Sequence, residues 1–347
     1  MAPGLANGVP FPQRRVVLAV QRLLNFSTHP GEPEMFNDDW NRISDFLHDR
    51  RFDGLELYPV GSYPFERIPP DLICGLHLRF FVLLRQIWQE NREELLRIFG
   101  SLDSVRHFYG GIDRQRIIDV YREQFELAHR LGCEYVVFHP AHCELEYIYT
   151  WNFPYRWQDT LDLSAEILNE SLRHSRYKGL LLFENLWWPG SFRLNAIEEY
   201  TYLRGRVAYD HCGIVLDTGH LLAAAGGFTR EDEAVAFLLK RAEELEELHH
   251  EIQAVHLCCS LSGEYIRNSR TENNSADTNL SFWPRLKQAR RHVSRIDTHD
   301  PFSLPAIGRF LELLDPRYVV FEFTFNNLGV WEKKISIQQK ALEDCLW

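Results

Sequence analysis

The chain lacks the features that mark several common classes of protein. Its seven cysteines form no Cys-x-x-Cys pair and no disulfide-framework spacing, and their odd number argues for reduced thiols in an intracellular compartment. No run reaches the roughly 18 apolar residues of a membrane helix, and residues 1–15 hold no apolar core of signal-peptide length. We therefore expect a soluble, cytoplasmic protein with no membrane partner.

Two further absences narrow the function. Neither GxGxxG nor GxxxxGK[ST] follows any apolar segment, which weakens the case for a nucleotide-binding fold. There is also no excess of basic residues, because the net charge is -11, and this argues against a nucleic-acid partner. A small anionic substrate stays open, since a few arginines in a cleft could hold one.

Eight short apolar segments alternate with helical patterns along the 347 residues. The patterns predict strands at Arg15–Val20, Asp53–Tyr58, Ile73–Phe81, Tyr135–His139, Gly179–Glu184, Gly213–Asp217, Ile252–Leu257 and Tyr318–Phe323. Helices are expected at Asn37–Arg51, Arg92–Phe99, Arg114–Leu131, Trp157–Ser175, Glu231–His250 and Trp331–Leu342. This order is typical of the α/β class with a parallel sheet.

A closed (β/α)₈ TIM barrel fits best, and an open doubly wound sheet is the alternative. We predict a flexible tail over residues 1–14 and a single barrel domain over 15–347. A long insertion, about 260–300, follows the seventh strand, and its first part, 260–281, is polar. Such a segment is too long for an idle loop, so it could be a lid, an oligomer contact or a mobile stretch.

Ligand-type residues stand at the ends of four successive predicted strands: Glu184, Asp217, His256 and Glu322. The carboxyl ends of parallel barrel strands meet on one face, where the active sites of this fold lie. Carboxylates buried together cost several kcal/mol each unless a cation compensates. The four residues therefore predict a site for a divalent metal such as Mn²⁺, Mg²⁺, Co²⁺ or Zn²⁺.

The motifs around these residues resemble the xylose-isomerase-like TIM-barrel superfamily, which includes sugar-phosphate isomerases and epimerases, related lyases and apurinic endonucleases. The resemblance runs from about Arg15 to the end and rests on Phe138-His139-Pro140, Phe183-Glu184-Asn185, Leu216-Asp217-Thr-Gly-His220, Val255-His256-Leu257 and Phe321-Glu322. In ketose epimerases and isomerases of this type, the residues matching Glu184, Asp217, His256 and Glu322 hold the metal. The two glutamates also serve as the acid/base pair, and the match of His220 contacts substrate.

The apurinic endonucleases of the same superfamily imply a second arrangement, in which further histidines and an Asp-x-His pair build a three-metal site. The matching candidates here are His77, His139, His220 and Asp297-Thr-His299. The Asp-x-His pair lies much farther beyond the seventh strand than that pattern leads us to expect. If all these groups converge, hydrolysis of a phosphoester by activated water becomes credible.

Other residues near the strand ends have two interpretations each. Trp187 and Trp188 could wall a sugar-like substrate or form a hydrophobic lid or dimer surface. Period-two alternation puts His77 and Arg79 on one strand face. Arg79 and Glu56 could bind substrate in the barrel mouth, the arginine taking a carboxylate or phosphate, or they could form a buried ion pair. His139 and His220 are further candidate substrate contacts.

Three functions remain open at this point. The leading hypothesis is a metal-dependent isomerase, epimerase or lyase acting on a small, carbohydrate-like polyhydroxy carbonyl compound, in which Glu184 and Glu322 move a proton and the metal stabilises the enediolate. The second is a multi-zinc phosphoester hydrolase. The third is a barrel that binds a metal or ligand without catalysis. Barrels of this kind often pair through loop faces, which leaves a homo-oligomer open.

Overall fold

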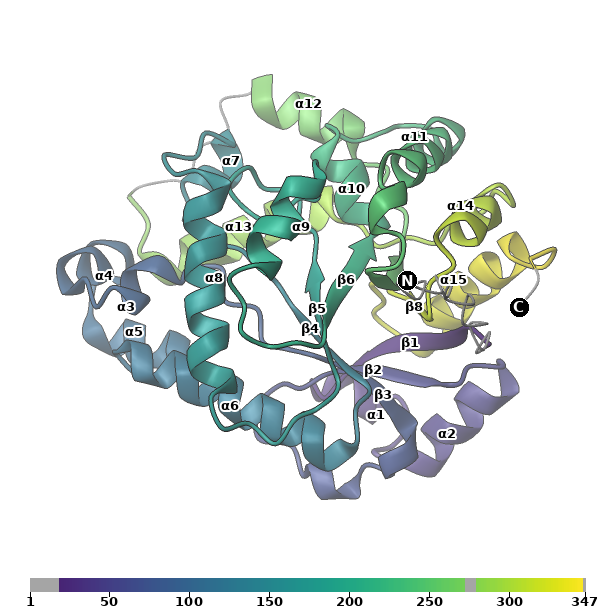
Figure 1. Ribbon diagram of the computed structural model, residues 1–347, viewed down its shortest axis with the longest axis horizontal. Helices are drawn as coiled ribbons and strands as arrows, with labels where there is room; N and C mark the ends of the chain where they lie inside the picture. Colours follow the sequence, from purple (N-terminus) through teal and green to yellow (C-terminus); the bar gives the residue numbers. More distant parts are fainter. Residues whose placement is uncertain (1–18, 272–278, 346–347) are drawn as a thin grey trace, which may run out of the picture.

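The computed structural model describes residues 19–271 and 279–345. Eight parallel strands close into a barrel in chain order, and β8 pairs with β1 (Figure 1). This confirms the predicted (β/α)₈ TIM barrel of the α/β class. The strands are β1 Gln21–Ser27, β2 Gly54–Tyr58, β3 Ile73–His77, β4 Tyr135–Phe138, β5 Leu180–Glu184, β6 Cys212–Asp217, β7 Ile252–Leu257 and β8 Tyr318–Phe321.

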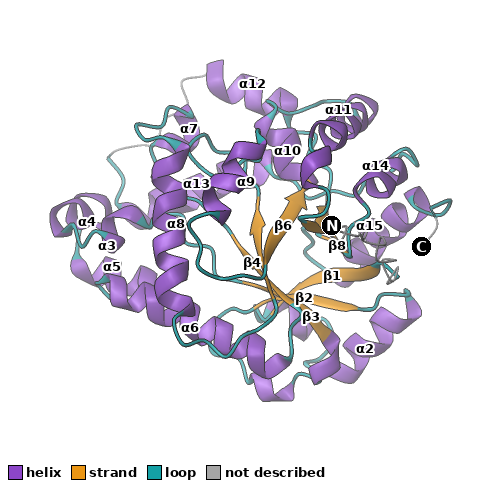
Figure 2. Cartoon of the chain, viewed as in Figure 1, coloured by secondary structure: helices purple, strands orange, loops and turns teal. Residues whose placement is uncertain are grey.

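Helices surround the strands (Figure 2). The longer ones are α2 Trp40–Asp49, α4 Arg92–Phe99, α5 Leu102–Tyr109, α6 Arg114–Leu131, α8 Trp157–Leu172, α9 Ile197–Arg204, α11 Glu231–Glu244, α12 Gly263–Thr271, α13 Phe282–Ile296, α14 Ile307–Leu314 and α15 Leu328–Ala341. The short ones are α1 Gly31–Glu34, α3 Arg85–Trp88, α7 Tyr147–Thr150 and α10 Thr218–Ala224, with 3₁₀ turns at Phe65–Arg67, Pro70–Leu72 and Glu246–Leu248.

Local sequence sets the ends of several helices. At α6, the Asp113 side chain accepts a hydrogen bond from the backbone N–H of Arg116, and the helix ends at Gly132 with φ 70°. An aspartate before the first turn and a left-handed glycine after the last are strong start and stop signals. The predicted bounds Arg114–Leu131 and Arg92–Phe99 are confirmed because both ends of each helix carry such signals.

The interior of the barrel is closed by an apolar layer. Its members are Leu23, Tyr135, Val137, Leu182, Val215, Ala254, Tyr318 and Val320, all with no exposed surface. The rings of Tyr135 and Tyr318 lie 4.6 Å apart across the barrel. Because this apolar layer fills the barrel interior, the polar residues at the carboxyl ends of the strands lie above a packed core and not above a channel.

Several predicted strands differ from the observed ones. β4 ends at Phe138 rather than His139, and β8 ends at Phe321 rather than Phe323. The first described strand is Gln21–Ser27, paired with β2 and β8, and the two described residues of the predicted Arg15–Val20, Ala19 and Val20, lie before it. Residues 15–18, like the predicted tail 1–14, lie outside the described residues. β3 ends at His77 rather than Phe81, so the alternation that placed Arg79 beside His77 does not extend that far.

The long connection after β7 is present and contains α12 and α13. Its base is closed by two backbone hydrogen bonds between Cys259 and Asp300, with N···O distances of 2.6 and 3.1 Å. Part of the polar stretch 260–281 folds as α12, and residues 272–278 lie outside the described ranges. Across the described parts of the chain, no helix combines the length and apolarity that crossing a bilayer demands.

Candidate metal centre

The turn after β6 fixes two candidate ligands at once. Asp217 ends the strand, and one of its carboxylate oxygens accepts a hydrogen bond of 2.6 Å from the backbone N–H of His220. The aspartate is therefore the N-cap of α10, and His220 follows one turn later. Asn185 grips the backbone of Asp217 with two hydrogen bonds, at 2.8 and 3.0 Å.

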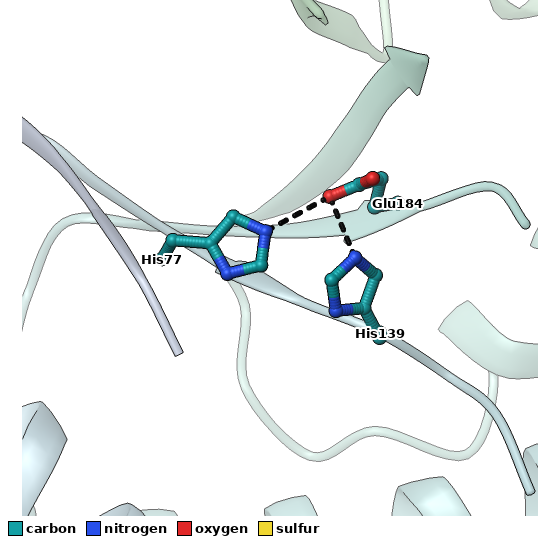
Figure 3. A group of neighbouring side chains, drawn as sticks. All are labelled: His77, His139 and Glu184. Carbon is teal, nitrogen blue, oxygen red and sulfur yellow. Dashed lines mark ion pairs between the residues drawn. The ribbon is translucent and has the colours of Figure 1, made fainter. Parts of the chain in front are cut away.

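Three side chains from β3, the end of β4 and β5 form a first group of candidate ligands. Nε2 of His77 lies 3.3 Å, and Nε2 of His139 3.0 Å, from the same oxygen of Glu184 (Figure 3). All three side chains are nearly buried. The group is hereafter the His77 group.

The four residues predicted from the strand ends form a second group, the tetrad. Nδ1 of His256 lies 3.1 Å from Glu322, 3.5 Å from Glu184 and 3.9 Å from Asp217, in each case to a carboxylate oxygen. Strand register explains part of this closeness, because Asp217 and His256 are partners in β6 and β7. Glu184 belongs to both the tetrad and the His77 group.

The Asp-x-His pair beyond α13 supplies a third group, the His220 group. One oxygen of Asp297 lies 3.2 Å from Nε2 of His220 and 2.8 Å from Nε2 of His299. His299 also lies 3.7 Å from Glu322, which links this group to the tetrad. The structure thus brings together all nine residues that the sequence offered as definite or additional ligands.

Hydrogen bonds behind the ligands fix the orientation of the imidazole rings. Nδ1 of His77 lies 3.1 Å from the carbonyl of Leu78, and Nδ1 of His299 lies 3.2 Å from that of Glu322. Oε2 of Glu56 accepts a hydrogen bond of 2.7 Å from the Tyr135 hydroxyl and lies 3.1 Å from Nε2 of His256. Metal-binding histidines carry such partners on the nitrogen that faces away from the metal.

The charges of the cluster are strongly coupled. Burial raises the pKa of Asp217 to about 7, although the charge of His220 opposes this rise. Burial alone would lower the pKa of His299, but the charge of Asp297 beside it raises this pKa to about 10. The neighbouring carboxylates thus favour a protonated His299, whereas burial lowers the pKa of His139. A cation bound by a protonated imidazole nitrogen would have to displace its proton.

The buried polar atoms fit a cation. Nδ1 of His256 lies 3.5 Å from Oε2 of Glu184 and 3.1 Å from Oε2 of Glu322. Among the described residues, none of these three buried atoms makes a hydrogen bond of ordinary geometry, although Oε2 of Glu184 also faces the histidines of the His77 group. Ligand atoms at about 2.0–2.2 Å from a tetrahedral zinc ion lie about 3.3–3.6 Å from one another. Unsatisfied buried groups at this spacing are the arrangement that a shared metal ion would satisfy.

A cavity of about 460 Å³ opens over the cluster. Five carboxylates line it, from Glu32, Glu56, Glu184, Asp297 and Glu322, and no described lining residue is a lysine or arginine. Its apolar walls come from Tyr58, Val60, Phe80, Leu186, Trp187, Trp188 and Val293. Without bound cations, this lining would repel an anionic substrate.

The predicted substrate contacts separate into two sets. Trp187 and Trp188 line the cavity, with Trp187 4.8 Å from the His220 ring, and neither indole N–H has a hydrogen-bond partner among the described residues. Arg79 is exposed and donates to the carbonyl of Phe108 at 3.0 Å, so it lies outside the cavity lining and forms no pair with Glu56. Glu56 lines the cavity, and one of its oxygens lies 3.1 Å from Nε2 of His256.

Some residues of the site escaped the sequence reasoning. Asn185 follows Glu184 directly, and that position was the available signal for its role. The thiol of Cys258 is buried, and its sulfur lies 3.8 Å from both oxygens of Asp217. Glu32 and His29, at the rim, carry no pattern that could have marked them.

Comparison with known proteins decides the family. The model of the family described as xylose isomerase-like TIM barrel matches residues 45–302. The chain belongs to this family. The match contains all the candidate ligands except Glu322, which lies beyond it, directly after β8. Among curated proteins, none matches the chain.

Solved structures share the fold at low sequence identity. Endonuclease IV from Thermus thermophilus is 16% identical, with a TM-score of 0.54, and the alignment covers 94% of this chain and 100% of the other. A D-tagatose 3-epimerase-like protein is also 16% identical, with a TM-score of 0.49 and coverage of 93% and 97%. An L-ribulose 3-epimerase is 12% identical, with a TM-score of 0.48 and coverage of 95% and 89%.

Proposed function

We propose that this protein is a phosphoester hydrolase that uses three divalent cations, one for each ligand group. The observation that carries the proposal is the convergence of the His77 group, the tetrad and the His220 group, joined through Glu184 and Glu322. A single-cation site would need only the tetrad. It would leave the two outer groups, each with two imidazoles and a carboxylate, without a chemical role.

The side chains have distinct tasks in this proposal. Glu184 would hold two cations together, since one of its oxygens faces both His77 and His139 while the same carboxylate belongs to the tetrad. Bound cations would polarise the phosphoryl oxygens and lower the pKa of a water molecule toward neutrality. Glu56 would keep His256 in the orientation that offers Nδ1 to the site.

The cavity walls would position the substrate. Trp187 and Trp188 offer ring faces and two indole N–H donors that have no partner among the described residues. We propose that these donors bind oxygen atoms of the ester beside the cations. His139 and His220 have their ring nitrogens close to carboxylates, so in this proposal they act as ligands rather than as substrate contacts.

A metal-dependent isomerase or epimerase, the leading hypothesis from the sequence, is the second candidate. The tetrad alone favours it, because Glu184 and Glu322 face one another across His256 and each keeps an oxygen without a hydrogen-bond partner. In that reaction, the two glutamates would take and return the proton beside a carbonyl. We rank it second because it gives no chemical role to the His77 group and the His220 group.

One pair of variants separates the two functions. Asp297→Asn removes the carboxylate shared by His220 and His299, and Asp300→Asn alters an exposed carboxylate three residues away that pairs with Lys334. The hydrolase predicts about three cations per chain by elemental analysis and release of p-nitrophenol from bis(p-nitrophenyl) phosphate. Asp297→Asn should then lose about one cation and most of this activity, while Asp300→Asn keeps both.

The competing outcomes are equally concrete. One cation per chain, epimerisation of a ketose and an unaffected metal content in Asp297→Asn would favour the isomerase. Metal binding without turnover of any phosphoester or ketose would favour the third possibility, a barrel that binds without catalysis.

A further inference from the structure

Helix α13 has a charge opposite to that of the whole chain. Its sequence, Phe282-Trp-Pro-Arg-Leu-Lys-Gln-Ala-Arg-Arg-His-Val-Ser-Arg-Ile296, contains five lysines and arginines and no acidic residue. The whole chain has a net charge of -11. The overall balance therefore hides one strongly cationic element in the insertion after β7 (Figure 1).

Some of these side chains hold the helix in place. Arg285 pairs with Glu146 at 2.6 Å, and the Arg295 guanidinium lies 4.1 Å from the centre of the Tyr265 ring. Phe282 packs against Phe99 of α4 at 4.2 Å between ring centres. The N-terminal end of α13 is thus anchored beside α4 and α5, far along the helix from Asp297.

The remaining three cations face solvent. Lys287, Arg290 and Arg291 are exposed and form no ion pair with any residue of the described ranges. Long basic side chains on a helix surface usually find an acidic neighbour three or four residues away, and α13 offers none. Within the described ranges, no acidic side chain neutralises their charge.

One side of α13 leads out of the cavity over the ligand groups. Val293 lines the cavity, Arg290 precedes it by three residues, and Trp283 precedes Arg290 by seven, so the three side chains share one side of the helix. Trp283 is 38% exposed and lies 4.9 Å from the ring of His107 on α5.

Arg79 extends the same surface from the opposite side. It donates to the carbonyl of Phe108, whose ring lies 6.3 Å from that of Trp283. Tyr58, a cavity residue, is close enough to Arg79 and Arg290 for both charges to oppose the rise that burial causes in its pKa. Arg79, Arg290, Lys287 and Trp283 form a track, hereafter the cationic track, that begins at the cavity rim.

We propose that the cationic track binds a single polynucleotide strand, one phosphodiester of which enters the cavity. Spaced cations with an exposed aromatic ring are the features by which proteins hold single strands, because phosphates pair with the charges and a base stacks on the ring. The length of α13, about 22 Å at 1.5 Å per residue, spans several nucleotides. The hydrolytic part of this inference rests on the proposed function, whereas strand binding does not.

This proposal revises the expectation that nucleic acid is no partner. That expectation came from the net charge, which averages over the whole surface. A strand meets the local charge of the track, and the cavity beside it would gain positive charge from bound cations. A free small phosphoester would need neither Lys287 nor Trp283, since both lie outside the cavity lining.

Fluorescence anisotropy of a labelled twelve-residue oligothymidylate tests the proposal on the full-length, metal-loaded protein. The strand's length is checked by gel electrophoresis after each titration. Arg290→Glu combined with Lys287→Glu should weaken binding at least about tenfold and flatten its salt dependence, since each lost phosphate contact removes about 0.7 from the logarithmic slope. Trp283→Ala should weaken binding about fivefold or more.

Arg291→Glu is the matched control, because it makes the same charge change one residue away, on the side of α13 turned from Val293. It should weaken binding less than threefold, with circular dichroism confirming that every variant folds. Equal weakening by Arg290→Glu and Arg291→Glu, absence of saturable binding, or tighter binding of the matching duplex would each overturn the proposal.

The readouts also separate this inference from the proposed function. If the protein binds the strand through Arg290 but hydrolyses no phosphoester, strand binding is supported and the proposed hydrolase function is contradicted. If the protein hydrolyses bis(p-nitrophenyl) phosphate but its Arg290→Glu variant binds oligothymidylate as the parent does, the hydrolase function is supported. Strand binding by the cationic track is then contradicted.

Discussion

Acidic side chains at the two ends of the same barrel are neutralised in different ways. At the closed end, Glu134 precedes β4, pairs with Arg317 and accepts the Tyr318 hydroxyl at 2.9 Å. At the open end, the carboxylates of the three ligand groups lie against imidazoles and have no lysine or arginine partner among the described residues. The closed-end carboxylate thus has its counter-ion within the chain, whereas in the proposed function the open-end carboxylates would be neutralised by bound cations.

Removing the carboxylate that two ligand groups share should have the largest effect on metal binding. Glu184→Gln should lose about two of three bound cations and reduce hydrolysis by about a thousandfold, because metal ions supply several kcal/mol of transition-state stabilisation. Elemental analysis and a phosphodiesterase assay measure the two effects. Full metal content in this variant would show that the open-end carboxylates are structural after all.

A smaller effect should follow from loosening a ligand without removing it. Asn185→Ala deletes both hydrogen bonds that grip the backbone of Asp217, and loss of such supporting contacts lowers metal affinity by about 10- to 100-fold. Competition with a chelator measures the affinity. Asn169→Ala is the control, because Asn169 makes two similar bonds, to the backbone of Arg206 and Ala208, away from the site.

Glu32 represents a third case, because its carboxyl group has neither an arginine nor an imidazole partner. Burial raises its pKa from 4.5 to about 7, with only the Ser27 N–H opposing the rise. The folded state thus favours the protonated form, so its stabilising contribution is complete below pH 4.5 and is lost as the pH rises through 7.

Glu32→Gln should therefore leave stability unchanged near pH 4.5 and raise it by about 2–3 kcal/mol above pH 7.5. Urea unfolding of the parent and variant at both pH values gives the difference directly. A variant that is equally stable relative to the parent at the two pH values would mean that Glu32 titrates as in the unfolded chain.

The smallest effect belongs to the closed end. Glu134→Gln should cost about 1 kcal/mol of stability, because Glu134 and Arg317 are each more than a third exposed and such pairs contribute little. It should leave metal content and hydrolysis unchanged. A loss of bound metal in this variant would contradict the division between the two ends.

The strand-end residues could be predicted from the sequence because each closes a short apolar run. Glu184, Asp217 and His256 stand at or near the ends of their strands, and barrel geometry then brings them together. The strongest additional signal was the family motif Asp217-Thr-Gly-His220, whose helix cap fixes the second ligand by spacing alone.

Other parts of the molecule depend on folding that no local pattern contains. Asp297 follows His256 by 41 residues (297 − 256), and α13 brings it back to the barrel mouth. Arg79 was predicted to lie on a strand, but that strand ends two residues earlier. The Arg79 guanidinium instead donates a hydrogen bond to a backbone carbonyl on α5. The first strand was predicted too early because Arg15–Val20 is more apolar than the observed β1.

The antiparallel bridge between Cys259 and Asp300 has a consequence for how this barrel could diversify. Because the two ends of the intervening segment are fastened to each other, helices can be exchanged or lengthened between them while the barrel beneath stays undisturbed. New surfaces for recognising different molecules can thus evolve on a barrel that is inherited intact.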